Sequence, residues 1–600
     1  MKERRHGFVP PRSLSTSRAT SSNIWTKLFA ALSLICLVWY RWSSQSVAFL
    51  SDSKFEWKWS EIAPSTDLQW HSCYEDRYEC ARLELPMDWQ DPGSAGRVVI
   101  ALARLPAKSA TDYKGSMFFN PGGPGGSGIW ALQDHGDLIQ EIVGDNYDII
   151  TFDPRGIGAS VPRVECWANP QQRWAWEAQE AGLVDSHEGM LYDLFARASA
   201  FSQACEKNAN ETDILSHLST ASHARDMLEI LDRLGEDKLK FWGFSYGTIL
   251  GGTFAAMYPD RVGRLVSDGN VDYGEWHSGT HINFLRDTDK VMEGFYSMCH
   301  QAGPEKCALY EDTVEKIKIR LNALLDSLRV KPVIALSTTT DGQSLPELIT
   351  YSKVRKFISA TLYRPVQKFG PLADAMAALE KDDGLAYQTI VNPGANALPD
   401  TCNQDPTPPT TPLDALFEGT DDAFPAIMCS DAEPLTETVF EFEEYANALQ
   451  EISKVAGAVN VLFRISCAGR TIRPKWRFSG PFTGNTSTPI LYIANVADNV
   501  TPLVSARNNS EGFDGSRILV QNSLGHTSLA APSTCTARHI RSYFQDGILP
   551  PVGTVCEPDK LPFDLSPAAD GEGIVGDDSL RPAIRALSER DGGGVGQIYT

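Results

Sequence analysis

The most constraining feature of the sequence is a serine between glycines, where a short apolar run meets a helical pattern. Gly243-Phe244-Ser245-Tyr246-Gly247 follows the run KLKFW and precedes TILGGTFAAM. A nucleophilic serine in such a strand-to-helix turn is held in a strained conformation, and the small flanking residues allow the sharp bend. The motif predicts that Ser245 presents its hydroxyl group at the end of a strand. The alternative is a serine in a glycine-rich packing turn.

Short apolar runs typical of buried strands alternate with helical patterns on both sides of this motif. The apolar runs are residues 97–103, 116–119, 147–152, 239–242, 264–267, 490–494 and 516–520, and the helical patterns are 221–234 and 248–257. Alternating strands and helices build a mostly parallel sheet with helices on both faces. The sequence therefore predicts an α/β fold.

The strand pattern lapses between residues 275 and 485, which we interpret as a largely helical cap inserted into the sheet domain. Helical patterns cover 311–328, 367–381 and 435–456, whereas 393–425 is rich in Pro, Asp and Thr and is expected to be a loop. The core is then formed by residues 70–274 and 486–560. Residues 561–600 contain few apolar positions and are expected to be a disordered tail.

A serine hydroxyl becomes a strong nucleophile only when a neighbouring base accepts its proton, so a histidine and an orienting carboxylate should follow Ser245. Among the 11 histidines, His526 lies in a Gly-His-Thr turn after a late apolar run and before a helical one. Asp498 follows the run ILYIA. The order Ser245, Asp498, His526 is that of Ser-Asp-His hydrolases. The alternatives are a turn-forming aspartate and a capping or surface histidine.

An acyl-transfer enzyme also needs hydrogen-bond donors for the oxyanion. The glycine-rich segment NPGGPGGSG follows the run SMFF, and glycines allow backbone N–H groups to approach a substrate oxygen closely. The backbone N–H groups of Gly123 and Tyr246 are the predicted oxyanion hole. A phosphate-binding loop is the rival interpretation, but the segment lacks the Lys-Ser/Thr ending of a P-loop.

The N-terminal segment has the pattern of a targeting signal. Residues 1–27 are basic and should stay in the cytoplasm, and the apolar stretch 28–42 forms the core of a signal anchor or a signal peptide. Residues 24–42 are just long enough for a membrane span, whereas cleavage after Ser46-Val47-Ala48 would release the body. Either outcome sends the remainder of the chain into the secretory pathway, as a type II membrane protein or a secreted one.

Net charge and cysteine content argue against two classes of function, nucleic-acid binding and metal binding. The net charge of −22 and the pI near 5.0 argue against nucleic acid as a partner.

None of the 12 cysteines forms a CxxC pair, so disulfides are favoured over metal sites. Close spacing suggests the pairs 73–80, 166–205, 299–307 and 535–556. Four N-glycosylation sequons, at Asn210, Asn485, Asn499 and Asn508, agree with secretion. Nothing in the sequence implies a metal ion or organic cofactor, and the oligomeric state is open.

The motifs taken as a group resemble a known family. NPGGPGGSG, FDPRGIGAS, GFSYGT, YPDRVGRLVSDG, ADNVTP and GHTSL, together with CARLELPMDW and CTARHIRSYFQDGILPPVGTVCEPD, are similar to the tripeptidyl aminopeptidase-like branch of the α/β-hydrolases, related to the prolyl aminopeptidases. The resemblance covers most of residues 70–560 and is weakest in the cap. It departs from the prolyl aminopeptidase pattern at Pro121, where those enzymes have the histidine of HGGPG.

This resemblance implies a serine peptidase that removes short peptides or single residues from free N-termini. It implies that Ser245 is the nucleophile, Asp498 the acid and His526 the base. A carboxylesterase or lactonase with the same triad is the second hypothesis, because a fold does not fix the substrate. A binding module on a hydrolase scaffold is the third, and inertness to a serine-directed fluorophosphonate would distinguish it.

Overall fold

The computed structural model describes residues 58–94, 96–179, 181–336, 346–391, 422–566 and 579–590. These residues belong to one compact unit, Lys58–Thr600. The predicted membrane segment, residues 24–42, lies outside the described part of the chain. Among the described helices, none combines the length and apolar character needed to cross a bilayer.

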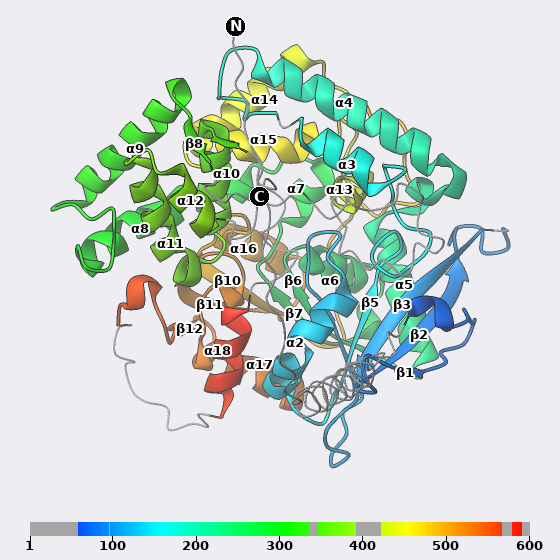
Figure 1. Cartoon of the computed structure of the whole chain (residues 1–600). Coiled ribbons are helices and arrows are strands. Elements are labelled where there is room, and N and C mark those ends of the chain that lie inside the picture. Colours follow the sequence, from blue (N-terminus) through cyan, green and yellow to red (C-terminus); the bar gives the residue numbers. More distant parts are fainter. Residues whose placement is uncertain are drawn as a thin grey trace, which may run out of the picture. The chain divides into compact units, whose positions relative to one another are not determined.

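Ten strands of the described chain form one sheet in the order β1-β2-β3-β5-β4-β6-β7-β10-β11-β12 (Figure 1). In chain order they are β1 His71–Cys73, β2 Tyr78–Pro86, β3 Arg97–Leu105, β4 Ser116–Asn120, β5 Asp148–Asp153, β6 Leu239–Phe244, β7 Val262–Asp268, β10 Leu491–Ala497, β11 Arg517–Leu524 and β12 Val555–Cys556. The strands from β5 to β12 along this order pair in parallel, and β1, β2 and β3 pair antiparallel at one edge. The predicted α/β fold with a mostly parallel sheet is confirmed.

Helices pack on both faces of this sheet. The core helices are α2 Gly128–Val143, α5 Thr220–Arg233, α6 Tyr246–Met257, α16 Leu503–Glu511, α17 Thr534–Asp546 and α18 Leu580–Glu589. Phe118 of β4 packs in the same apolar cluster as α5 and α6, whereas its buried neighbours Met117 and Phe119 lie outside that cluster. Since side chains alternate across a strand, these two face the other side of the sheet. There α2, α17 and α18 pack against one another.

A largely helical segment lies between β7 and β10, and we call it the helical insertion. It contains α7 Tyr273–Ser278, α8 Thr288–Ala302, α9 Val314–Val330, α10 Tyr351–Thr361, α11 Pro365–Leu379, α12 Gly384–Val391, α13 Ala423–Asp431, α14 Val439–Ile452, α15 Gly457–Ile465 and the hairpin β8 Val333–Ala335 and β9 Glu347–Ile349. Two further helices, α3 Pro170–Glu177 and α4 Met190–Ala209, precede α5. Helix α4 packs against α14 and α15 of the insertion (Figure 1).

Five disulfides link cysteines of the described chain. The four pairs suggested by close spacing, 73–80, 166–205, 299–307 and 535–556, are confirmed. Cys36 and Cys402 lie outside the described residues. Because disulfides persist in oxidising compartments, these bonds indicate an extracellular or secreted protein.

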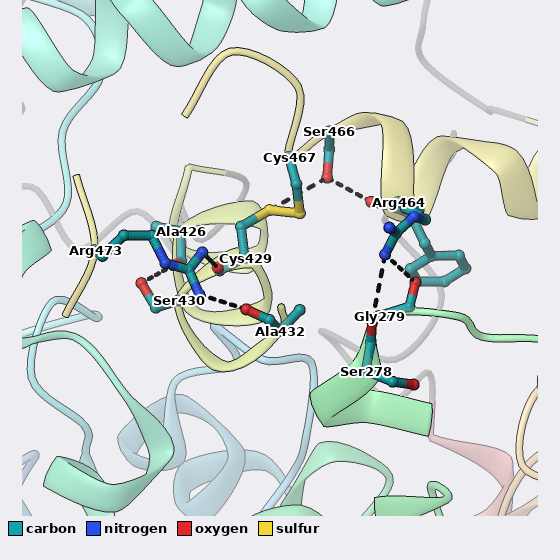
Figure 2. Close-up of a disulfide and its surroundings, with 11 residues drawn as sticks. Ser278, Gly279, Ala426, Cys429, Ser430, Ala432, Arg464, Ser466, Cys467 and Arg473 are labelled. Carbon is teal, nitrogen blue, oxygen red and sulfur yellow. Dashed lines mark hydrogen bonds between the residues drawn. A yellow bond between two sulfur atoms is a disulfide. The ribbon is translucent and has the colours of Figure 1, made fainter. Parts of the chain in front are cut away.

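The fifth disulfide, Cys429–Cys467, was not predicted from the sequence, and it joins the end of α13 to the segment after α15 (Figure 2). Arg473 donates to the carbonyl oxygen of Cys429 at 2.6 Å and also to that of Ala432, so it binds the open end of α13. Arg464 of α15 donates to the carbonyl oxygen of Gly279 at 3.0 Å. Together these contacts fasten α13 and α15 to the start of the insertion.

Two expectations from the sequence are wrong in part. Residues 423–425, expected to lie in a loop, begin helix α13. The segment 561–600, expected to be a disordered tail, contains helix α18, whose buried residues are Leu580, Ala583, Ile584, Leu587 and Ser588. The apolar members of this set recur at three- and four-residue spacing, so they form a stripe that packs on α2. Low average hydrophobicity of the whole segment concealed this stripe.

Candidate active site

The structure places Ser245 in a sharp turn between β6 and α6, with φ 54° and ψ −119°. This backbone conformation is strained for a residue with a side chain. The turn also brings the flanking glycines together, because a Cβ atom on Gly243 would lie 2.4 Å from the carbonyl oxygen of Gly247. The N–H of Ser245 donates to the carbonyl oxygen of Asp268 at 3.0 Å, which ties the turn to the end of β7.

Asp498 and His526 meet at the ends of the neighbouring strands β10 and β11. His526 Nδ1 lies 3.1 Å from Asp498 Oδ1 and 3.0 Å from Oδ2, and both side chains are 1% exposed. A carboxylate at this position accepts the Nδ1 hydrogen and leaves Nε2 as the proton acceptor. The two predicted side chains are in contact, although 27 residues separate them in the sequence.

Thr501 completes this contact. Its hydroxyl oxygen lies 2.7 Å from Asp498 Oδ2 and 2.9 Å from His526 Nδ1, and its backbone N–H donates to Asp498 Oδ1 at 2.9 Å. The N–H groups of Val500 and Thr527 also donate to the Asp498 carboxylate, at 2.9 Å and 3.1 Å. These donors hold the buried carboxylate in the orientation that faces the imidazole. Thr501 was not predicted from the sequence, although a threonine three residues after an aspartate in a turn is a signal for such a bond.

The other ring nitrogen of His526, Nε2, is buried and has no hydrogen-bond partner within the described part of the chain. It is therefore available to accept a proton. Ser245 and His526 both contact the turn after β7, Ser245 through the Asp268 carbonyl and His526 through Gly269. A Cβ atom on Gly269 would lie 3.3 Å from His526 Cε1. Catalytic hydrogen bonds are often open in ligand-free enzymes and close when the substrate binds.

The glycine-rich segment after β4 lies directly against the serine turn. A Cβ atom on Gly122, at φ 101°, would lie 2.9 Å from Ser245 Cβ and 3.4 Å from the Tyr246 nitrogen. The Gly122 N–H donates to Asn120 Oδ1 at 3.0 Å and the Gly126 N–H to the Gly122 carbonyl oxygen at 3.2 Å. The N–H of Gly123 donates to no acceptor among the described residues. The segment that contains Gly123, one predicted oxyanion donor, thus lies beside the backbone nitrogen of Tyr246, the other predicted donor.

A buried aspartate holds this glycine-rich segment in place. Asp153, at the end of β5, accepts from the Ser127 hydroxyl at 2.8 Å and from the N–H groups of Ile129 at 3.3 Å and Ala159 at 2.8 Å. Burial raises the pKa of Asp153, and these hydrogen bonds oppose the rise. Asp153 belongs to the motif FDPRGIGAS, and its role was not predicted from the sequence.

The side chain of Tyr246 anchors the other predicted donor. Its hydroxyl oxygen lies 2.7 Å from Thr220 Oγ1 and 3.0 Å from His223 Nδ1, both on α5. Asp431 of the helical insertion accepts from the Thr220 N–H at 2.8 Å and from the Trp276 indole at 2.9 Å. Burial lowers the pKa of His223 to about 3, so this imidazole is neutral. The backbone position of residue 246 is therefore fixed from both α5 and the insertion.

Acidic residues of the insertion are candidates for binding a substrate ammonium group, but three of them contact other groups: Asp422, Glu441 and Glu443, which accepts from the Tyr192 hydroxyl at 3.4 Å. Asp422 is 2% exposed and pairs with Arg173 at 2.6 Å. Glu441 caps the start of α14 through Thr438. Glu443 and Glu444 are exposed on the same helix, and Asp421 lies outside the described residues.

Comparisons with known proteins agree with this geometry. The family model described as "alpha/beta hydrolase fold" matches residues 115–356, and the one described as "TAP-like protein" matches residues 453–556. The first match contains Ser245 and the second contains Asp498 and His526.

The curated relatives align with this chain over most of the length of both proteins. The tripeptidyl aminopeptidase of Streptomyces lividans is 25% identical over 515 residues, 83% of this chain and 88% of that protein. Serine protease Hip1 of Mycobacterium tuberculosis is 25% identical over 481 residues, 80% of this chain and 87% of that protein. Carboxylesterase B of the same species is 25% identical over 514 residues, 83% of this chain and 91% of that protein. The sheet, the strained serine turn and these matches together place the chain among the enzymes of the α/β-hydrolase superfamily, in its tripeptidyl aminopeptidase-like branch.

Proposed function

We propose that this protein is a serine exopeptidase that releases short peptides or single residues from free N-termini, with Ser245 as nucleophile, His526 as base and Asp498 as orienting acid. The observation that carries the proposal is the buried Asp498–His526 contact, in which Nε2 has no partner among the described residues and Asp268 ties the loop of His526 to the turn of Ser245. The relatives named tripeptidyl aminopeptidase and serine protease Hip1 support a peptide substrate.

In the acylation step His526 Nε2 takes the proton of the Ser245 hydroxyl as its oxygen attacks the carbonyl carbon. The negative charge that develops on the carbonyl oxygen is held by the N–H groups of Gly123 and Tyr246. The imidazolium is stabilised by Asp498 and then gives its proton to the leaving amine, so the peptide C–N bond breaks. The N-terminal fragment stays on Ser245 as an ester.

Water completes the cycle by the same route. His526 takes a proton from the water molecule as it attacks the ester carbonyl, and the proton returns to Ser245 when the acyl product leaves. Every proton in the cycle is carried by His526, so no metal ion or organic cofactor is needed for these steps.

The helical insertion is proposed to act as a cap that limits the enzyme to chain ends. It contacts the site at two places, because Asp431 reaches the Tyr246 network and Tyr363 accepts a backbone hydrogen bond from His526. An enzyme that recognises a free N-terminus must also bind an ammonium group, a role that suits an acidic side chain.

A carboxylesterase is the second candidate, favoured by the match to carboxylesterase B over 83% of this chain. The same serine, base and oxyanion donors cleave a carboxylic ester, since only the leaving group differs.

The location of the protein in the cell is also part of this proposal. We place the body outside the cytoplasm, either held by residues 24–42 as a type II membrane protein or released by cleavage after Ala48.

The test is hydrolysis by the purified full chain of a panel of peptidyl amides with free and blocked N-termini, together with short-chain esters. Cleavage of the free but not of the blocked peptides is the expected result. Ser245→Ala is the matched control and should lose at least about 10³-fold in kcat while keeping the melting temperature. Cleavage of esters alone would favour the carboxylesterase over the exopeptidase. Full activity in Ser245→Ala would contradict both candidate functions.

A further inference from the structure

The loop that carries His526, residues 525–529, is held by a separate acceptor for each of its first four N–H groups. Gly525 donates to the Ala497 carbonyl at 3.0 Å, Thr527 to Asp498 Oδ2 at 3.1 Å and Ser528 to Asp268 Oδ1 at 2.7 Å. Those three acceptors lie at the ends of β7 and β10. The fourth N–H, that of His526 itself, donates at 3.0 Å to the carbonyl oxygen of Tyr363, between α10 and α11 of the helical insertion.

The same turn of the insertion contacts the loop in three further ways. The Tyr363 ring packs on the His526 imidazole in a T-shaped arrangement, with ring centroids 5.2 Å apart and an angle of 79° between the planes. Arg364 donates to the Leu529 carbonyl at 2.6 Å. Pro365 lies so close to Gly525 that a Cβ atom there would be 2.4 Å from Pro365 Cδ. Residues 363–365 thus touch both ends of the histidine loop and the imidazole between them.

Asp498 by itself leaves one degree of freedom open. A carboxylate that accepts from Nδ1 fixes the position of that atom, but the imidazole plane can still tilt about the hydrogen bond. Tilting would carry Nε2, on the opposite side of the ring, away from the serine hydroxyl. The edge-to-face contact with Tyr363 opposes this tilt, because aromatic pairs at such distances contribute about 0.5–1.5 kcal/mol beyond the area that they bury.

We infer that Tyr363 is a positioning residue for the reaction: its carbonyl group and ring, supplied by the helical insertion, hold the His526 imidazole in the plane from which Nε2 reaches Ser245. This inference rests on the proposed function. It extends the role of the insertion from covering the site to completing it, because one of the supports of the base is absent from the sheet domain.

The test compares three variants of the full chain. Tyr363→Leu removes the ring, and Tyr363→Phe keeps it without the hydroxyl group. Tyr387→Leu is the matched control, because Tyr387 also makes a T-shaped contact within the insertion, with Phe357 at 5.9 Å, and has no contact with the histidine loop in the described chain. The measurements are kcat and KM, the rate of Ser245 labelling by a fluorophosphonate, and the melting temperature.

Tyr363→Leu is expected to lower kcat and the labelling rate about 10-fold or less, with KM little changed, since a lost aromatic pair is worth about 1 kcal/mol. Tyr363→Phe should recover most of that loss, and Tyr387→Leu should lower only the melting temperature. The inference is overturned by wild-type kcat and labelling in Tyr363→Leu, by an equal loss in Tyr363→Phe, or by an equal loss in Tyr387→Leu. Failure of the proposed function is a different result, in which the wild-type chain itself is not labelled.

Discussion

The side-chain carboxylate of Asp268 accepts two hydrogen bonds from Ser528, from its N–H at 2.7 Å and from its hydroxyl group at 2.6 Å. The carbonyl oxygen of the same aspartate accepts from the N–H of Ser245 at 3.0 Å. One residue at the end of β7 thus ties the turn of Ser245 to the loop of His526. The proposed catalytic geometry therefore depends on a buried carboxylate outside the proposed triad.

Replacing this carboxylate should change how stability depends on pH. Burial raises the pKa of Asp268 from 3.8 to about 6, and the hydrogen bonds from Ser528 and Trp242 oppose the rise. Because the folded state holds the proton more tightly than the unfolded state, stability falls as the pH rises through this window. Asp268→Asn does not titrate there. Its free energy of unfolding relative to wild type should therefore rise by up to about 3 kcal/mol between pH 4 and pH 7.

Urea unfolding of both proteins at several pH values measures this difference. Other groups titrate alike in the two proteins and cancel. A difference that stays constant from pH 4 to pH 7 would mean that Asp268 remains charged throughout that range.

Thr501→Val should lower kcat about 10-fold, because the hydroxyl group that donates to Asp498 Oδ2 at 2.7 Å is lost and a buried acceptor is left with fewer donors. Valine has nearly the same shape, so KM and the melting temperature should change little. Thr501→Ser restores the hydroxyl and should recover most of the rate. Steady-state kinetics of the two variants measure this difference in kcat. Equal kcat values for both would mean that the Thr501 hydroxyl group does not support the reaction.

Gly122→Ala should abolish most activity. The added methyl group would lie 2.6 Å from the Phe244 carbonyl oxygen and 2.9 Å from Ser245 Cβ, so the glycine-rich segment or the serine turn must shift. Gly235→Ala is the control, since Gly235 also has a positive φ, 72°, with nothing within 4 Å of the added atom. It should cost about 1 kcal/mol of stability through backbone strain and leave kcat unchanged. Comparable kcat values for the two variants would argue against an oxyanion role of this segment.

Replacing both Cys429 and Cys467 by serine should destabilise the protein by about 2–4 kcal/mol, because the bond closes a loop between residues 38 apart in the sequence. The contacts of Arg464 and Arg473 remain in this variant and should keep α13 and α15 folded (Figure 2). Denaturant unfolding measures the loss. A double variant as stable as wild type would place the stability of this part of the insertion in the arginine contacts.

Glycan occupancy should differ among the sequons. Asn499 is 6% exposed and directly follows Asp498, the proposed acid, so a glycan there would crowd the site. Asn210 is exposed and serves as the comparison within the same chain. Glycopeptide mapping of the secreted protein should find Asn499 unmodified. Occupancy at Asn499 would contradict the placement of Asp498 as the acid.

Local sequence determined the elements of the sheet domain. The apolar runs became β3, β4, β5, β6, β7, β10 and β11, and GFSYG became the strained turn of Ser245. These predictions succeed because each depends on a few adjacent residues whose backbone preferences and alternating burial are local properties. The order Ser245, Asp498, His526 could be proposed for the same reason, since Ser245 and Asp498 directly follow strands and His526 lies in the turn just after one.

Only the tertiary structure decided which residues support those three. Thr501, Asp153, Asp268 and Tyr363 act through contacts whose partners lie far away in the chain or across a turn, and no local pattern distinguishes them from other polar or aromatic residues. Helix α18 was concealed for a related reason, because its apolar stripe is favourable only when α2 is present to cover it. The sequence by itself determined the strand and the turn of the proposed nucleophile, whereas long-range packing decided how the proposed base is held. Burial and hydrogen-bond geometry arise only when distant segments meet.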